Sequence, residues 1–175
     1  RGNTKAAREL ALHGAGQERG RFRCGAPGVG KTHRTVAIVQ HAVAHGRSAL
    51  VVPFVSLLDE IKGAMRKTEK GELEHILKTL KEVDCLALDD VGTQQDTPWV
   101  GERLYEIVNG RYNARRQLII TTNARGVDDL ESMIGKNGPQ IASRLREMTP
   151  PYIMEADDYR MKDGAKQNEL KLEVA

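Results

Sequence analysis

The segment that most constrains this chain is residues 25–32, which read GAPGVGKT and match the phosphate-binding pattern G-x-x-x-x-G-K-[ST]. Its glycines let the backbone wrap around a phosphate with its amides pointing inward, because side chains would obstruct that approach. Lys31 then reaches the β- and γ-phosphates, and Thr32 offers a hydroxyl to Mg²⁺. The helix that starts here adds its positive N-terminal end. The alternative is an ordinary glycine-rich turn before a helix. The residues expected to contact a nucleoside triphosphate are Gly25, Ala26, Pro27, Gly28, Val29, Gly30, Lys31 and Thr32.

Length and composition limit the class of protein. The chain has 175 residues, which suits a single domain with one core. Cys24 and Cys85 are not in a C-x-x-C arrangement and lie in strand-like runs, so we expect buried core cysteines in a reducing compartment. No apolar run approaches the roughly 20 residues needed to cross a bilayer, and the first residues lack a signal-peptide pattern. We therefore expect a soluble cytoplasmic protein with no membrane contact.

Strand-like runs alternate with helical patterns along the whole chain. This alternation predicts an α/β fold, in which a five-stranded parallel sheet is flanked by helices on both faces. The strands are expected at 21–24, 48–52, 83–89, 117–122 and 152–155, and residues 162–175 are expected to be a frayed tail or a terminal helix. Apolar residues at helical spacing are Val36, Val39 and Val43; Leu57, Ile61 and Met65; Leu73, Ile76, Leu77 and Leu80; Val100, Leu104, Ile107 and Val108; and Ile141, Leu145 and Met148.

A Walker B pattern follows the third strand, where the apolar residues 86–88 lead into Asp89 and Asp90. Because the carboxyl ends of parallel strands open onto one crevice, Asp89 can reach the Mg²⁺ held by Thr32. Asp90 would lie near the γ-phosphate and orient or deprotonate water, although its side chain is one methylene shorter than a glutamate. Slow hydrolysis is the natural inference. The alternative is that the two side chains cap the following turn.

The fourth strand ends in Thr121, Thr122 and Asn123, so an uncharged amide is expected at the same rim. An amide both donates and accepts hydrogen bonds. Asn123 is therefore predicted to hold the attacking water and contact the γ-phosphate. Its alternative interpretation is an ordinary loop residue.

A basic helix covers residues 141–148. Arg144 and Arg146 cannot both share the apolar face of Ile141 and Leu145. We expect an exposed arginine here to enter the nucleotide site of a neighbouring subunit as an arginine finger. The alternative is a solvated basic face. Arg160, further along the chain, faces either solvent or the nucleotide.

These elements together resemble the AAA+ ATPases of the DnaC/DnaI helicase-loader group, which is related to the IstB transposition helpers. The resemblance covers nearly the whole chain. The segments that carry it are GAPGVGKTH at 25–33, LALDDVG at 86–92, LYEIVNGRY at 104–112, IITTN at 119–123, IASRLREM at 141–148 and DDYR at 157–160.

The resemblance implies roles, ligands and partners. It makes Asn123 the sensor 1 residue, Arg144 the trans-acting finger and Arg160 a second sensor, and adds His33 to the nucleotide-binding residues. It implies ATP and Mg²⁺ as cofactors, and a homo-oligomer with ATP at its subunit interfaces. Its implied partners are single-stranded DNA and a replicative helicase. Residues 1–175 would form one AAA+ domain without a complete helical lid and without the family's N-terminal helicase-binding region.

Two other functions remain open. One is an IstB-like transposition helper that prefers duplex DNA, and the other is an ATP-binding adaptor that does not hydrolyse. The formal net charge of +3 permits contact with nucleic acid. Acidic residues are interspersed with the candidate DNA-contacting residues, which is also typical of a solvated face. Those candidates are Lys62, Arg66, Lys67, Lys70, Lys78 and Lys81, with Arg111, Arg115 and Arg116 as a second cluster.

The strand before the phosphate loop departs from the family pattern, because Arg21 and Arg23 alternate with Phe22 and Cys24. A buried guanidinium is costly on a central strand. We therefore expect these arginines at an exposed strand start or at an open edge. Arg34 likewise stands where the family usually has an apolar residue.

Overall fold

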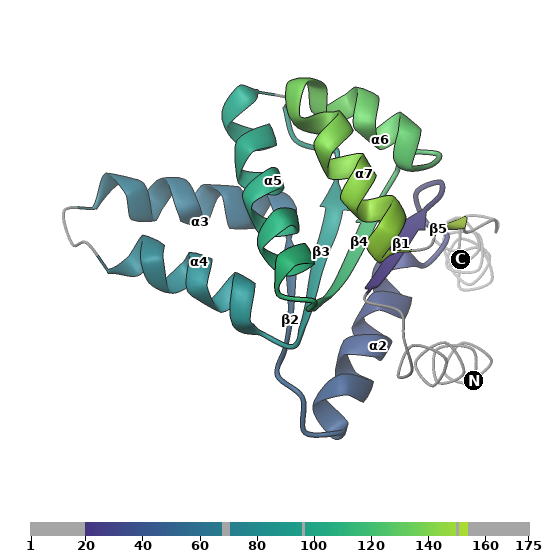
Figure 1. The fold of residues 1–175 in the computed structure, drawn as a ribbon. Coiled ribbons are helices and arrows are strands. Elements are labelled where there is room, and N and C mark those ends of the chain that lie inside the picture. The colour runs from purple at the N-terminus through teal and green to yellow at the C-terminus, as the bar shows by residue number, and fades with distance from the viewer. Residues whose placement is uncertain (1–19, 68–70, 96, 150, 154–175) are drawn as a thin grey trace, which may run out of the picture.

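The computed structural model describes residues 20–67, 71–95, 97–149 and 151–153, and Figure 1 shows their arrangement around one sheet. The five strands lie in the order β2-β3-β4-β1-β5 and every neighbouring pair is parallel. The α/β fold with a five-stranded parallel sheet is therefore confirmed. The strands are β1 (Gly20–Cys24), β2 (Ala49–Pro53), β3 (Cys85–Val91), β4 (Gln117–Thr122) and β5 (Pro151–Ile153).

Helices cover both faces of the sheet. Helix α2 (Lys31–Ala44) lies behind the sheet in Figure 1, and α5 (Pro98–Asn113), α6 (Val127–Ile134) and α7 (Gly138–Met148) lie in front. Helices α3 (Phe54–Arg66) and α4 (Glu72–Glu82) extend to one side as a pair, and a short 3₁₀ turn η1 (Gly135–Asn137) precedes α7. None of the helices in the described part of the chain is long and apolar enough to cross a membrane.

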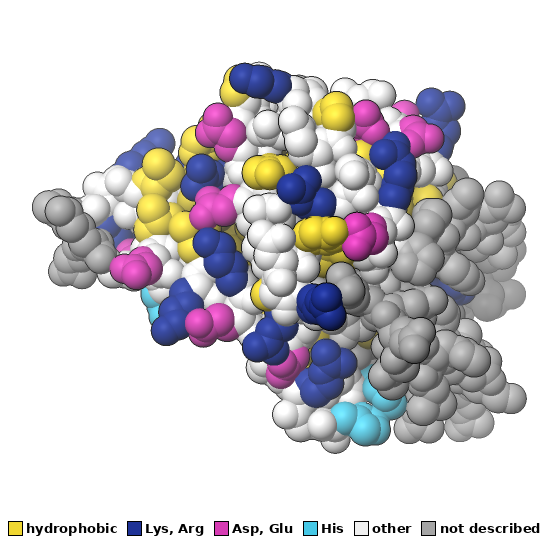
Figure 2. Space-filling view, viewed as in Figure 1, with side chains coloured by type: hydrophobic (Ala, Val, Ile, Leu, Met, Phe, Trp, Pro, Cys, Tyr) yellow, Lys and Arg dark blue, Asp and Glu magenta, His cyan; other side chains and the backbone are white. Residues whose placement is uncertain are grey.

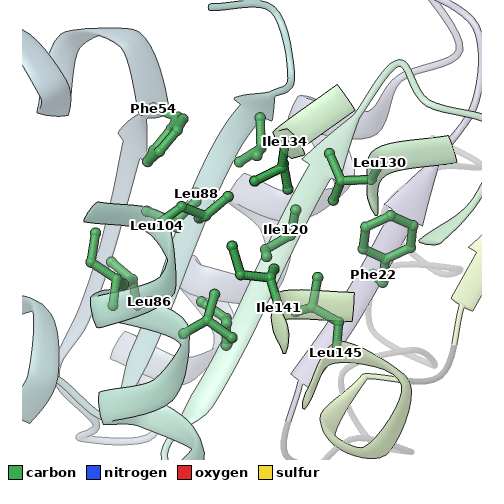
Figure 3. Packing of buried hydrophobic residues seen from close by; sticks show 14 of the residues in the cluster. Phe22, Phe54, Leu86, Leu88, Leu104, Ile120, Leu130, Ile134, Ile141 and Leu145 are labelled. Atoms are coloured by element: carbon green, nitrogen blue, oxygen red, sulfur yellow. The ribbon is translucent and has the colours of Figure 1, made fainter. Parts of the chain in front are cut away.

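The core has two parts because side chains of a strand alternate between its faces. Leu86 and Leu88 of β3 belong to the large cluster beneath α3, α5 and α7, which Figure 3 shows. Cys85 and Ala87 belong to the smaller cluster against α2. With both faces covered, β3 is apolar on every position up to Leu88, as buried parallel strands are. The predicted burial of both cysteines is confirmed.

Two apolar residues of the predicted helices lie outside the core, and one helix was not predicted. Val43 is 54% exposed and Met65 is 53% exposed, because the buried face of each helix passes through the preceding residue, Ala42 in α2 and Ala64 in α3. The spacing also gave no prediction of α6, which has only eight residues and whose N-cap residue Gly126 makes no side-chain cap.

The expected exposure of Arg23 is also wrong. Strand β1 lies between β4 and β5, with Arg23 opposite Thr121 and Tyr152, and Arg23 is 1% exposed. It therefore lies inside the sheet rather than at an open edge. The side chain of Arg21 lies outside the described residues.

Arg111 is the second basic residue that the sequence misplaced. It was expected in a DNA-contacting cluster with Arg115 and Arg116, yet it is fully buried. Its guanidinium donates to the carbonyl oxygens of Leu80 at 2.7 Å, Val83 at 2.9 Å, Asp84 at 3.3 Å and Gln117 at 2.6 Å. Arg111 thus connects the end of α4 with the starts of β3 and β4, and it is a structural residue.

Candidate nucleotide-binding site

The loop between β1 and α2 has the backbone that phosphate binding needs. Gly28 and Gly30 adopt φ angles of 80° and 86°, in the left-handed region that favours glycine. Gly30 is the N-cap of α2, where no side chain caps the helix and no acidic residue lies in the first turn. The first amides of α2 are therefore free of a capping side chain, and with the helix dipole they favour an anion.

Lys31 lies folded over this loop and is only 6% exposed. Its Nζ donates to the carbonyl oxygens of Gly25 at 2.8 Å and Ala26 at 2.9 Å, and to Oδ1 of Asn123 at 2.8 Å. These three bonds equal the three N–H donors of an ammonium group. Phosphate oxygens would replace one or more of these acceptors, so the predicted phosphate-binding lysine is already positioned at the loop.

Thr32 and Asp89 meet at the start of α2 and the end of β3. The hydroxyl of Thr32 donates to Asp89 Oδ2 at 2.9 Å and contacts Oδ1 at 3.1 Å. A hydroxyl beside a carboxylate is an oxygen donor set that fits Mg²⁺. Within the described ranges no three His, Cys, Asp or Glu residues cluster as a metal site, so a metal ion here would take its remaining ligands from the nucleotide and water.

Asp90 and Asn123 lie at the same edge of the sheet and both are exposed. Asp90 follows Asp89 directly and has a φ angle of 55°, an uncommon conformation for a residue with a side chain. Asn123 follows β4 and accepts the hydrogen bond from Lys31. The structure therefore joins Lys31 with Asn123 and Thr32 with Asp89 by hydrogen bonds at the edge of the sheet where Asp90 lies, whereas the catalytic roles of these residues remain predictions.

Arg144 lies elsewhere, on α7 and on the opposite face of the sheet from α2 (Figure 1). It is partly buried rather than exposed as expected, because α7 packs against α5. Its Nε donates to Asn109 Oδ1 at 2.8 Å, and its other nitrogens donate to the hydroxyl of Tyr105 and to the carbonyl of Gln140. The guanidinium carbon also lies 4.9 Å from the centre of the Tyr105 ring. All of these contacts come from α5 and α7, and within the described residues none of them is with Lys31, Thr32, Asp89 or Asn123.

Arg146, the other arginine of this helix, pairs with Asp128 and Glu131 of α6. These hydrogen bonds raise the pKa of Arg146 further above its usual value. Arg160 and Lys70 lie outside the described residues, as does the second half of the predicted fifth strand, residues 154 and 155.

One buried residue near the site was not assigned a role from the sequence. Thr121 is fully buried, and its hydroxyl donates to Asp89 Oδ1 at 2.5 Å. Its position opposite the paired aspartates on the neighbouring strand was the signal that could have identified it. Burial raises the pKa of the Cys24 thiol, more than the charge of Lys31 lowers it, so Cys24 stays protonated and serves as a core residue.

Comparisons with known proteins place the chain in a family and identify similar proteins. A family model described as IstB-like ATP binding protein matches residues 21–165. The replicative helicase loader DnaC of Buchnera aphidicola subsp. Schizaphis graminum is 29% identical over 137 residues, or 78% of this chain and 54% of the relative. DnaC of Escherichia coli K12 is 26% identical over 144 residues, or 82% of this chain and 57% of the relative.

Among solved structures, the crystal structure of the DnaC helicase loader is similar with a TM-score of 0.72 and 27% identity. The match covers 86% of this chain and 87% of that one. The chain thus spans little more than half the length of the two curated relatives but nearly all of the solved domain.

Proposed function

Because this chain belongs to the IstB-like ATP-binding protein family, we propose that it is the ATPase domain of a replicative helicase loader. It would bind ATP at the loop after β1, hydrolyse it slowly, and form oligomers with ATP between subunits. The observation that carries the proposal is the contact network of Lys31 with Asn123 and of Thr32 with Asp89. These contacts bring together segments that are far apart in sequence, which supports a shared site for phosphate and Mg²⁺.

Each residue of the network has a role in the proposed reaction. Lys31 and the loop amides bind the phosphates, and Asn123 contacts the γ-phosphate and the attacking water. Mg²⁺, held by Thr32 and Asp89, supplies charge neutralisation when it is bound. Asp90 accepts a proton from the attacking water while the water oxygen forms a bond to the γ-phosphorus. The bond from that phosphorus to the bridging oxygen breaks, and ADP and phosphate leave.

The proposal that a replicative helicase is the partner rests on the relatives, which are named replicative helicase loaders. The proposal of single-stranded DNA rests on the resemblance to the helicase loaders, with weak support from the basic residues of this chain. Lysines of α3 and α4 are partly engaged within the chain: Lys67 pairs with Glu72, Lys81 with Glu106, and Lys62 lies over the Trp99 ring. Figure 2 shows basic and acidic side chains mixed on this face, so any DNA contact would be electrostatic and modest.

We expect the chain to bind single-stranded DNA more tightly than duplex DNA of equal length, as fluorescence anisotropy of labelled oligonucleotides would measure. The affinity should fall steeply as salt rises, because released counterions drive such binding. Tighter binding to duplex DNA would favour the transposition helper instead. Affinity independent of salt, or no binding at low salt, would contradict the DNA proposal.

We expect Arg144→Ala to lower ATP turnover by about a hundredfold or more while nucleotide affinity stays near the wild-type value. The reason is that Arg144 would act only on the nucleotide of a neighbouring subunit. Phosphate release and ATP binding measure the two effects separately. The control is Arg146→Ala, whose side chain makes only surface ion pairs with α6.

Mixing two variants tests the action across subunits. Arg144→Ala subunits keep an intact phosphate loop, and Lys31→Ala subunits keep Arg144. Where the two meet, one subunit supplies the ATP site and the other the arginine, so a mixture should recover turnover that neither variant has alone. A mixture that stays inactive would contradict action in trans. ATP binding by the wild type without any phosphate release, with DNA present, would favour the non-hydrolysing adaptor.

A further inference from the structure

Strands β3 and β4 are irregular where the paired aspartates lie. Leu88 of β3 is opposite Ile120, and the next paired residues are Val91 and Thr122, with a register shift between the two pairs. Two residues of β3, Asp89 and Asp90, therefore stand opposite one residue of β4, Thr121. This is the geometry of a β-bulge, which adds a residue to one strand and redirects its side chains.

The bulge determines where the Asp90 side chain lies. Alternation along β3 places Leu86 and Leu88 on the face of the large core, so a regular strand would place Asp90 on that face next. A carboxylate there would be buried among apolar side chains. Instead Val91 occupies the core, fully buried, and Asp90 is exposed with its φ angle of 55°.

Thr121 makes hydrogen bonds to both residues of the bulge with one hydroxyl group. Its Oγ1 donates to Asp89 Oδ1 at 2.5 Å and accepts from the Asp90 backbone N–H at 2.9 Å. The first bond fixes the carboxylate that also contacts Thr32, and the second stabilises the left-handed backbone of Asp90. A threonine hydroxyl has one donor, so no other residue receives a hydrogen bond from it.

We propose that Thr121 is a positioning residue of the nucleotide site, which sets the metal-binding carboxylate of Asp89 and the exposed orientation of Asp90 together. The inference rests on the proposed ATPase function. It assigns no contact of Thr121 with the nucleotide. Residues that orient metal ligands in this way commonly change metal affinity or activity by about 10- to 100-fold when they are replaced.

We expect Thr121→Val, which keeps the shape of the side chain and removes the hydroxyl, to lower turnover by about 10- to 100-fold. It should also raise the Mg²⁺ concentration needed for tight ATP binding, with little change in ATP affinity when Mg²⁺ is chelated. Thr121→Ser, which keeps the hydroxyl, should restore both properties. The matched control is Thr149→Val, since Thr149 is also fully buried and its hydroxyl donates to the carbonyl oxygen of Leu145 in α7.

A second measurement uses the protein without nucleotide. Amide hydrogen exchange at Asp90 should be faster in Thr121→Val than in the wild type, because the N–H loses its acceptor. Unchanged exchange together with an unchanged Mg²⁺ dependence would overturn the inference even if the wild type proves to be an active ATPase. If the wild type binds no ATP and exchange at Asp90 is still faster in Thr121→Val, the hydrogen bond is supported, but the proposed function is overturned and with it the positioning role of Thr121 in a nucleotide site.

Discussion

Lys31→Ala is expected to weaken ATP binding by about 10²- to 10⁴-fold, which places it beyond detection in a typical titration. The Lys31 ammonium supplies charge-assisted hydrogen bonds to the phosphates, each worth about 1.5–3 kcal/mol, and the change removes about two of them. Calorimetric titration with a non-hydrolysable ATP analogue would measure the loss. Circular dichroism would verify that the fold is kept.

The control for this experiment is Lys67→Ala, which removes an exposed lysine of equal charge that pairs with Glu72 beyond the end of α3. Its effect on ATP affinity should be within about twofold, since charges separated by more than a Debye length are screened. An Lys31→Ala protein with wild-type affinity would show that the loop binds no phosphate in this way.

Arg111→Ala is expected to lower the free energy of unfolding by about 3–5 kcal/mol, a large share of the stability of a domain of this size. The change leaves the carbonyls of Leu80, Val83 and Gln117 without their donor and opens a cavity beneath α5. Burial lowers the pKa of Arg111 to about 10, so the group is charged at neutral pH and needs these acceptors. Urea denaturation monitored by circular dichroism would measure the effect.

Two further variants identify the cause of this loss. Arg111→Lys keeps the charge but not the planar fork, so it should recover only part of the stability. Arg116→Ala removes a neighbouring arginine that is 41% exposed and pairs with Asp84, and it should cost less than about 1 kcal/mol. A loss in Arg111→Ala no larger than that in Arg116→Ala would show that the four carbonyl contacts contribute little.

The sequence predicted the parts of the site that depend on local spacing and on the parallel sheet. The phosphate loop is encoded within residues 25–32, and its shape depends on glycines at fixed positions. The shared location of Asp89 and Asn123 could be predicted because parallel strands end at one edge of the sheet. That rule needs no knowledge of side-chain packing. The strand boundaries were accordingly close, and those of β4 coincide with the prediction.

The rest depended on tertiary packing. Arg111 and Arg116 are near neighbours in a basic stretch, yet one is buried and the other is partly exposed, because only Arg111 lies where α4, β3 and β4 meet. The contacts of Arg144 with α5 also join residues more than 30 positions apart. The bulge at Asp90 escaped prediction because strand register is set by pairing rather than by either strand alone.

The contact between Lys31 and Asn123 makes nucleotide binding a competition. The Lys31 ammonium already donates to oxygen acceptors of the loop and to Asn123. The free energy that a phosphate gains from Lys31 is therefore only the difference between its hydrogen bonds and the ones it replaces. A ligand whose phosphate displaces Asn123 from Lys31 also frees the Asn123 amide. Phosphate binding at the loop after β1 would thereby change the hydrogen bonds available at the end of β4.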